Sequence, residues 1–193
     1  MIMKRLLLLL FVCCTAFACE KFEIPDIEID REITRSSMNG YYQQVSHQFL
    51  KYEDGKAVEL KLVPDSPPWP ISDTRYFVLD DMFATPYLST KFENITQAFI
   101  NDRHSSPVDL QALKMTSGWN VYMSDIHKLT YDTLILLEPV SEAIKRCKDD
   151  KNYTRSYNVY VRVSPSKDLL ESFDNAMPMS EYGSFWDNVF KNN

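Results

Sequence analysis

The chain has 193 residues, of which 45% are hydrophobic and 25% charged, and this predicts one globular domain with a substantial core. Its formal net charge of −6 argues against a nucleic-acid binder, because phosphate neutralisation needs clustered lysine and arginine. Only four glycines occur in the whole chain, so a glycine-rich phosphate-binding loop is not expected.

The first segment, residues 1–18, has the pattern of a secretory signal peptide. Lys4 and Arg5 precede an apolar run from Leu6 to Val12, and small residues follow. The run is too short for a membrane-spanning helix, which needs roughly 20 apolar residues. We therefore expect export of the remaining chain.

The end of this segment reads Ala16-Phe17-Ala18-Cys19 and resembles the bacterial lipobox, in which signal peptidase II cuts before a cysteine that then carries lipid. The resemblance implies a lipoprotein held to a membrane by acyl chains on Cys19. The alternative is an ordinary signal peptide cut after Ala18. Glu20 follows Cys19, whereas Asp at that position marks inner-membrane retention in enteric lipoproteins, so the resemblance favours the outer membrane. The acidic residues that follow also resemble the export tags of surface lipoproteins.

Residues 19–37 are predicted to be an acidic tether, because the run after Cys19 is rich in carboxylates and contains Pro25. Loss of Lys4 and Arg5 with the signal leaves the mature chain at −8 (−6 − 2). Cys147 is then the one cysteine left beside Cys19, so no internal disulfide is expected. Two readings of Cys147 remain open, a structural thiol and a reactive thiol that acts as a nucleophile or bridges to a partner.

Residues 38–163 carry a series of short β-strand signals. Strands are predicted over 41–52, 57–63, 75–79, 87–92, 108–116, 119–124, 129–137 and 153–163. A tight turn is predicted at Asp54-Gly55, because this pair tolerates positive φ angles. Other connections are a proline-rich loop that carries Trp69, a helical turn over 96–100, a turn over 125–128 and a helix or helical loop over 139–152.

Residues 164–193 are predicted to form a helical extension. Pro165 suits the first turn of a helix, and a second helix is predicted over 181–190. Four aromatic residues of the second helix are expected to face inward, either as packing on the sheet or as a docking surface for another protein. They are Tyr182, Phe185, Trp186 and Phe190.

Eight short strands joined mostly by turns predict a mostly β fold with a short C-terminal helical tail, and the β part is either a closed antiparallel barrel or a sandwich. The run Gly40-Tyr41-Tyr42-Gln43-Gln44-Val45-Ser46 resembles the opening motif of bacterial lipocalin-like domains, with Tyr42 in the place of a tryptophan. Residues 129–136 and 157–163 are similar to a late strand and the closing strand of that family. The resemblance covers about 39–163 and favours an eight-stranded antiparallel barrel. It implies that Arg162 caps Tyr42 and closes one end of the barrel.

No catalytic signature is present. His47, His104 and His127 do not lie at metal-ligand spacing, so neither a metal nor another cofactor is expected. We expect binding rather than catalysis, with an enzyme as a third and weaker reading. Convergent polar side chains with perturbed pKa values in a cleft would favour the enzyme hypothesis.

Two binding hypotheses follow. The first is a small apolar or amphipathic ligand in a barrel lumen lined by Trp119, Val121 and Met123, with Trp69 either as a lid or as an exposed ring that stacks on a sugar. The second is a filled barrel that serves as an accessory subunit of an envelope complex. It would use Trp69 and the C-terminal aromatic residues.

Overall fold

The computed structural model describes residues 24, 26–30, 32–33, 35–62, 72–81, 83–100, 106–116, 123–138 and 152–192. The predicted signal peptide and the predicted helix over 139–152, apart from Asn152, lie outside these residues. So do six residues singled out in the sequence: Cys19, Trp69, His104, Trp119, Val121 and Cys147.

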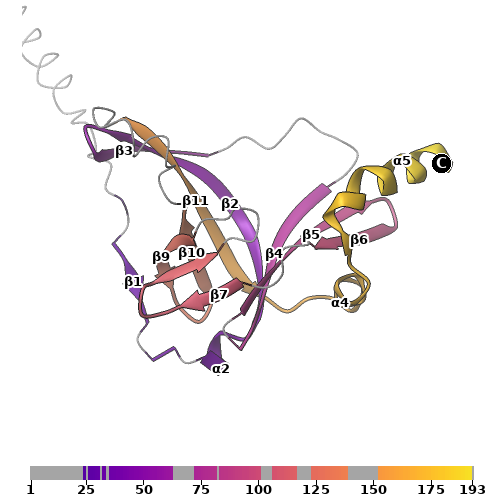
Figure 1. Cartoon of the computed structure of the whole chain (residues 1–193), viewed down its shortest axis with the longest axis horizontal. Helices are drawn as coiled ribbons and strands as arrows, with labels where there is room; N and C mark the ends of the chain where they lie inside the picture. The colour runs from indigo at the N-terminus through magenta and orange to yellow at the C-terminus, as the bar shows by residue number, and fades with distance from the viewer. Residues whose placement is uncertain are drawn as a thin grey trace, which may run out of the picture.

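The described chain is mostly β, as predicted, with short helices at its C-terminal end (Figure 1). The strands are β1 (Glu28–Ile29), β2 (Gly40–Glu53), β3 (Lys56–Leu62), β4 (Ser72–Asp80), β5 (Phe83–Phe92), β6 (Ile95–Ile100), β7 (Ser106–Asp109), β8 (Lys114–Thr116), β9 (Met123–Leu129), β10 (Thr133–Leu137), β11 (Tyr153–Val163) and β12 (Met177–Pro178). The helices are α2 (Arg35–Met38), α4 (Lys167–Asp174), the 3₁₀ turn η1 (Met179–Glu181) and α5 (Tyr182–Asn192).

These strands form one sheet with the order β12-β6-β5-β4-β2-β11-β10-β9-β8-β7, to which β3 adds beside β2 and β1 beside β9. Two residue pairs also link β7 with the start of β5, Phe83 with Pro107 and Ala84 with Ser106. The predicted closed eight-stranded barrel is not confirmed. Two pairings explain why the sheet opens. β2 and β4 pair only over Gly40–Gln43 and then separate, and β5 pairs with β6 over most of its length (Figure 1).

Two predicted turns are strands in the structure. The helical turn expected over 96–100 is β6, which pairs with β5 from Ile95 to Ile100. The turn expected over 125–128 lies inside β9, where Ser124 and Ile126 are buried. The predicted strand 108–116 is instead the hairpin β7–β8, with a turn in which Leu113 has a φ of 51°.

The strand predictions over 41–52, 57–63, 75–79, 87–92 and 153–163 are confirmed within a few residues, with the long pair β2–β11 as the centre of the sheet. Of the predicted strand 119–124, only Met123 and Ser124 are among the described residues, and they begin β9. Asp54 and Gly55 have φ angles of 49° and 74°, as the tight turn between β2 and β3 requires. The seventh predicted strand, 129–137, divides at a turn near Tyr131 into the end of β9 and β10.

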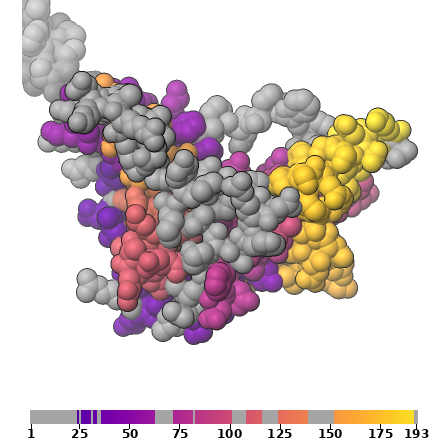
Figure 2. All heavy atoms as spheres, in the orientation of Figure 1, coloured from indigo at the N-terminus to yellow at the C-terminus, as the bar shows by residue number. Residues whose placement is uncertain are grey.

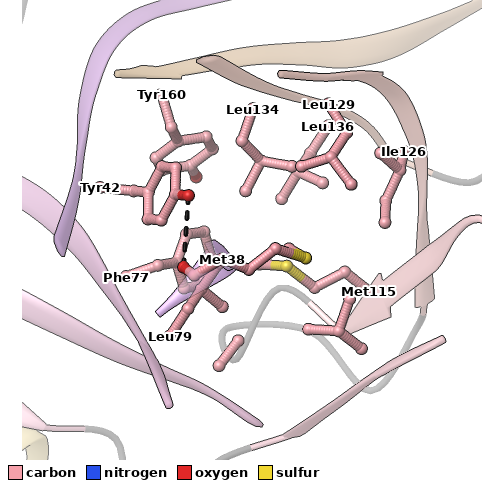
Figure 3. Packing of buried hydrophobic residues seen from close by; sticks show 12 residues of the cluster. Met38, Tyr42, Phe77, Leu79, Met115, Ile126, Leu129, Leu134, Leu136 and Tyr160 are labelled. Carbon is pink, nitrogen blue, oxygen red and sulfur yellow. Dashed lines mark hydrogen bonds between the residues drawn. The ribbon is translucent and has the colours of Figure 1, made fainter. Parts of the chain in front are cut away.

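An inner cluster of buried side chains lies between the facing strands, and its members point toward one another (Figure 3). Each is at most 6% exposed. The inner cluster comprises Met38, Tyr42, Phe77, Leu79, Ala84, Val108, Met115, Ile126, Leu129, Leu134, Leu136 and Tyr160. Eight strands and α2 contribute to it, so this cluster holds the two sides of the sheet together.

An outer cluster covers the opposite face of β10 and β11. Leu134 and Leu136 belong to the inner cluster, whereas the alternate residues Ile135 and Leu137 belong to the outer one. The buried members of the outer cluster are Leu50, Tyr52, Ile135, Leu137 and Tyr157.

Part of the predicted tether belongs to the folded domain. Glu28 and Ile29 pair in parallel with Lys128 and Leu129 of β9, and Ile29 and Ile33 pack against the inner cluster. Further toward the N-terminus, Ile24 packs against the outer cluster. The tether sequence therefore contacts the domain at Ile24, at Glu28 and Ile29, and at Ile33.

Candidate functional site

A hollow with a volume of about 420 Å³ lies beside α5, where β6 and β12 pair. Four apolar side chains line it, Ile95 of β6, Met177 of β12, and Phe185 and Val189 of α5. Phe185 and Val189 are four residues apart and so share one face of the helix. The hollow is open to solvent, and α5 forms the yellow ridge in the space-filling view (Figure 2).

Three polar residues complete the lining, Glu181 of η1 and Ser184 and Asn188 of α5. Ser184 donates a hydrogen bond from its hydroxyl to the backbone carbonyl of Glu181 at 3.0 Å. Glu181 and Ser184 are exposed, so an incoming group can reach them. The lining therefore combines an apolar floor with side chains that donate and accept hydrogen bonds.

Edge-to-face aromatic contacts fix α5 on the sheet. Phe99 of β6 contacts Tyr182 and Phe185, with ring centroids 5.1 and 5.7 Å apart. Phe92 of β5 contacts Phe190 at 5.1 Å and Trp186 at 6.3 Å. Such pairs contribute about 0.5–1.5 kcal/mol each beyond the area that they bury. The hollow is therefore built on a helix that is firmly held.

The four aromatic residues predicted to face inward do pack on the sheet. Trp186 is 3% exposed, whereas Phe190 remains 42% exposed. Within the described part of the chain, the Trp186 indole N–H has no hydrogen-bond partner. Packing, rather than display of Trp186 on the surface, is thus the role that the structure gives to this residue.

A hydrogen bond from Tyr182 to Asp73 joins the start of α5 to β4. The Tyr182 hydroxyl donates to Asp73 Oδ2 at 3.1 Å. Burial, followed by the nearby Asp73 carboxylate, raises the pKa of Tyr182 to about 12. Burial also raises the pKa of Asp73, and the bond from Tyr182 and the charge of Arg75 oppose this shift.

The predicted pair Tyr42 and Arg162 is brought together at the end of the sheet near α2. The Arg162 guanidinium carbon lies 5.8 Å from the Tyr42 ring centroid, and 4.3 Å from the centroid of Tyr131. Arg162 also donates to the backbone carbonyls of Ser37, at 2.8 Å, and of Asn39. Sequence reasoning missed Tyr131, because it lies in a turn and only the fold carries it over the guanidinium.

Two polar side chains, one on β2 and one on β11, form a hydrogen-bonded pair beside residues of the inner cluster. Gln44 donates from its amide nitrogen to Asn158 Oδ1 at 2.9 Å, and Asn158 is buried. His47 is half-buried and stands edge-on to Phe49 at 5.3 Å. Burial, and then the charge of Arg75, lowers the pKa of His47, so neutral His47 is favoured.

The remaining candidate residues show no metal or catalytic arrangement in the described chain. His127 is buried against Tyr157, with ring centroids 5.8 Å apart. No group of three or more His, Cys, Asp and Glu side chains has the geometry of a metal site within the described residues. Met123 begins β9, where it pairs with Thr116.

Neither a protein-family model nor a curated protein matches the sequence. Among the helices in the described ranges, none combines the length and the apolar character needed to span a membrane.

Proposed function

We propose that this chain is a lipid-anchored lipoprotein of the cell envelope whose domain binds another envelope protein and does not catalyse a reaction. The anchor is the acyl-modified Cys19, and the outer membrane is the expected location. The lipobox-like sequence Ala16-Phe17-Ala18-Cys19 supports this part of the proposal. Acyl chains contribute roughly 0.8 kcal/mol per buried methylene, so a multiply acylated cysteine is a firm anchor.

The observation that carries the binding role is the packed interior. A lumenal binder needs a cavity, whereas the inner cluster brings twelve side chains of at most 6% exposure into one packed group (Figure 3). Tyr42, Phe77 and Tyr160 fill one end of it, and Phe77 and Tyr160 have ring centroids 4.8 Å apart. Among the described residues, this packing supports recognition on the outer surface rather than in a lumen.

The hollow beside α5 is an outer surface suited to recognition in the described part of the chain. Ile95, Met177, Phe185 and Val189 accept an apolar side chain, and Glu181 and Asn188 surround it with hydrogen-bonding groups. An apolar centre with a polar rim is the usual anatomy of a protein interface. We infer that an apolar or aromatic anchor of the partner enters this hollow, as interface anchors commonly do.

A small apolar or amphipathic ligand in the same hollow is the second candidate. The volume of about 420 Å³ falls in the range of small-molecule pockets, roughly 300–1,000 Å³, and favours it. The open shape of the hollow favours the protein partner, because small-molecule pockets bury most of the ligand surface.

A lipocalin-like barrel remains a proposal for the architecture. The two residue pairs between β5 and β7 support it, because they connect the last strand of the sheet order with an earlier one. The proximity of Arg162 to Tyr42 supports the family resemblance as well.

The experiment is site-specific photo-cross-linking in the native host. A benzophenone amino acid replaces Val189 in the hollow, and the matched control carries it at Phe83, an exposed residue at the far end of β5 from Phe92. We expect a discrete cross-linked protein from position 189, absent from position 83 and lost when Phe185→Glu is added. The absence of any position-dependent cross-link would overturn the protein-partner proposal.

Native mass spectrometry of the purified protein tests the second candidate, which predicts an added small-molecule mass.

A further inference from the structure

The outer cluster holds the chain at Ile24, which is close in sequence to Cys19, the proposed site of lipid attachment. Ile24 packs against this cluster, whose members include Leu50 and Tyr52 at the β3 end of β2. Cys19 precedes Ile24 by five residues. A fully extended chain spans at most about 3.3–3.6 Å per residue, so five residues reach roughly 17 Å. An acyl-anchored Cys19 thus keeps this end of the domain beside the bilayer.

The β2–β3 hairpin at this end has no net formal charge. Residues 48–62 contain three lysines, Lys51, Lys56 and Lys61, and three carboxylates, Glu53, Asp54 and Glu59. Their formal charges sum to zero (3 − 3) in a mature chain of −8 (−6 − 2). An anionic bilayer surface repels acidic protein surfaces and does not repel this one.

The opposite end of the molecule is acidic. Residues 167–192 of the C-terminal segment have a net charge of −3 (2 − 5), from two lysines and five carboxylates. β3 and α5 lie on opposite sides of the molecule (Figure 1). The charge distribution therefore favours an orientation in which β3 faces an anionic bilayer and α5 faces away from it.

Apolar side chains are exposed on this hairpin. Leu62 is 62% exposed, Phe49 is 42% exposed and Val58 is 37% exposed. Leu62 lies opposite Gln48 and Phe49 opposite Lys61, so Leu62 and Phe49 are exposed on different faces of the hairpin. Leu62 lies at the end of β3, which pairs with β2 alone among the described strands. Exposed apolar groups on a neutral surface next to lysines suit the boundary between headgroups and acyl chains, where lysine stems cover apolar surface and their ammonium groups reach the headgroups.

We propose that the β2–β3 hairpin is the membrane-facing surface of the domain and that the hollow beside α5 points away from the bilayer. This orientation rests on the lipid anchor at Cys19 in the proposed function. It assigns the exposed Leu62 to the bilayer surface and leaves Phe185 and Val189 accessible to a partner in the aqueous phase.

The test uses the full lipidated protein, purified from its host with Cys147→Ser and reconstituted in phosphatidylethanolamine–phosphatidylglycerol vesicles. A fluorescent label is placed at Leu62→Cys or, as the matched control, at Phe190→Cys on α5, where the native side chain is likewise exposed, to 42%. Brominated lipids then quench the label according to its distance from the acyl chains. We expect at least threefold stronger quenching at position 62 than at position 190, and equal or reversed quenching would overturn the orientation.

Two further measurements distinguish a failure of the proposed orientation from a failure of the proposed lipid anchor. The intact mass of the N-terminal peptide reports the acyl chains on Cys19, and their absence would overturn the proposed function whatever the quenching shows. An insertion of ten Gly/Ser residues between Glu23 and Ile24 retains the lipid but lengthens the connection. We expect weaker quenching at position 62 in this variant, and unchanged quenching would overturn the role of the short connection. Circular dichroism verifies that each labelled variant is folded.

Discussion

Arg162 lies directly over Gly40, so that a Cβ atom placed on Gly40 would be 3.0 Å from Arg162 Nη2. The φ angle of Gly40 is +153°, a backbone conformation that L-residues with a side chain rarely adopt. Gly40 thus permits the start of β2 to pass beneath the guanidinium that bonds to Ser37 and Asn39. This relationship links Gly40, the first residue of β2, to Arg162 near the end of β11.

Gly40→Ala should destabilise the domain, because the added methyl group both strains the backbone and displaces Arg162. We expect a loss of about 1–3 kcal/mol in the free energy of unfolding, measured by urea denaturation. A change of 1 kcal/mol corresponds to roughly 2–4 °C in Tm for a chain of this size.

Gly183→Ala is the matched control for this prediction. Nothing lies within 4 Å of a Cβ atom at Gly183, which occupies the first turn of α5. Alanine there should be neutral or stabilise the domain by up to about 1 kcal/mol, because glycine costs this much in a helix. Equal effects of the two substitutions would contradict the role given to Gly40.

Arg162→Lys should weaken the end of the sheet near α2. A lysine ammonium keeps the charge but does not reproduce the planar fork that bonds to Ser37 and Asn39 and stacks 4.3 Å above Tyr131. We expect a loss of roughly 1–3 kcal/mol in the free energy of unfolding. A double-mutant cycle with Tyr131→Ala should give a coupling of about 0.5–2 kcal/mol, and additive effects would exclude a contribution from the stack.

Local patterns predicted the strands that alternate in burial and the turn at Asp54-Gly55. The same patterns failed at 125–128, because Asp125 and Lys128 look like turn residues. In the structure, Asp125 pairs with Arg155 at 2.6 Å, and Lys128 pairs with Glu28 at 2.5 Å. Both partners are distant in sequence, so no local rule reveals that the segment between them is a strand.

The candidate site was predictable only in part. Helical spacing identified the inward face of α5, and Trp186 and Phe185 do pack on the sheet. The hollow itself depends on the pairing of Met177 with Phe99, which brings β12 to β6 across 78 residues. The opening of the sheet also could not be predicted from the sequence. The separation of β4 from β2 depends on the register between strands rather than on residue type.

Asp73→Asn should change how stability depends on pH. The pKa of Asp73 is raised above its ordinary 3.8, so the folded state binds more protons than the unfolded state between 3.8 and the raised value. Stability from this group is therefore lost as the pH rises through that window. Asparagine retains an acceptor for Tyr182 without a charge.

The free energy of unfolding of the two proteins should accordingly be measured from pH 3.5 to pH 7. We expect the advantage of Asp73→Asn over the wild type to grow as the pH rises above about 4 and then to level off. Tyr182→Phe removes the 3.1 Å hydrogen bond and should loosen α5. An advantage of Asp73→Asn that shrinks with rising pH would contradict the direction of the shift.

Leu134→Ala tests whether the interior is as closely packed as the proposed function requires. Leu134 is fully buried at the centre of the inner cluster, next to Leu129 and Tyr160 in the register of β10 (Figure 3). Loss of its methyl groups should cost about 2–5 kcal/mol, through lost transfer energy and the cavity left behind. Val45→Ala, at a side chain that is 53% exposed, should cost less than about 0.5 kcal/mol.

A second readout distinguishes a filled interior from an open lumen. The cavity created by Leu134→Ala should be dry and apolar, so xenon or benzene should raise the Tm of this variant and leave that of the wild type unchanged. In a protein with an open apolar lumen, both forms would respond, and Leu134→Ala would cost little because the neighbouring space would already be empty. Stabilisation of the wild type by these probes would therefore return the interior to the list of candidate binding sites.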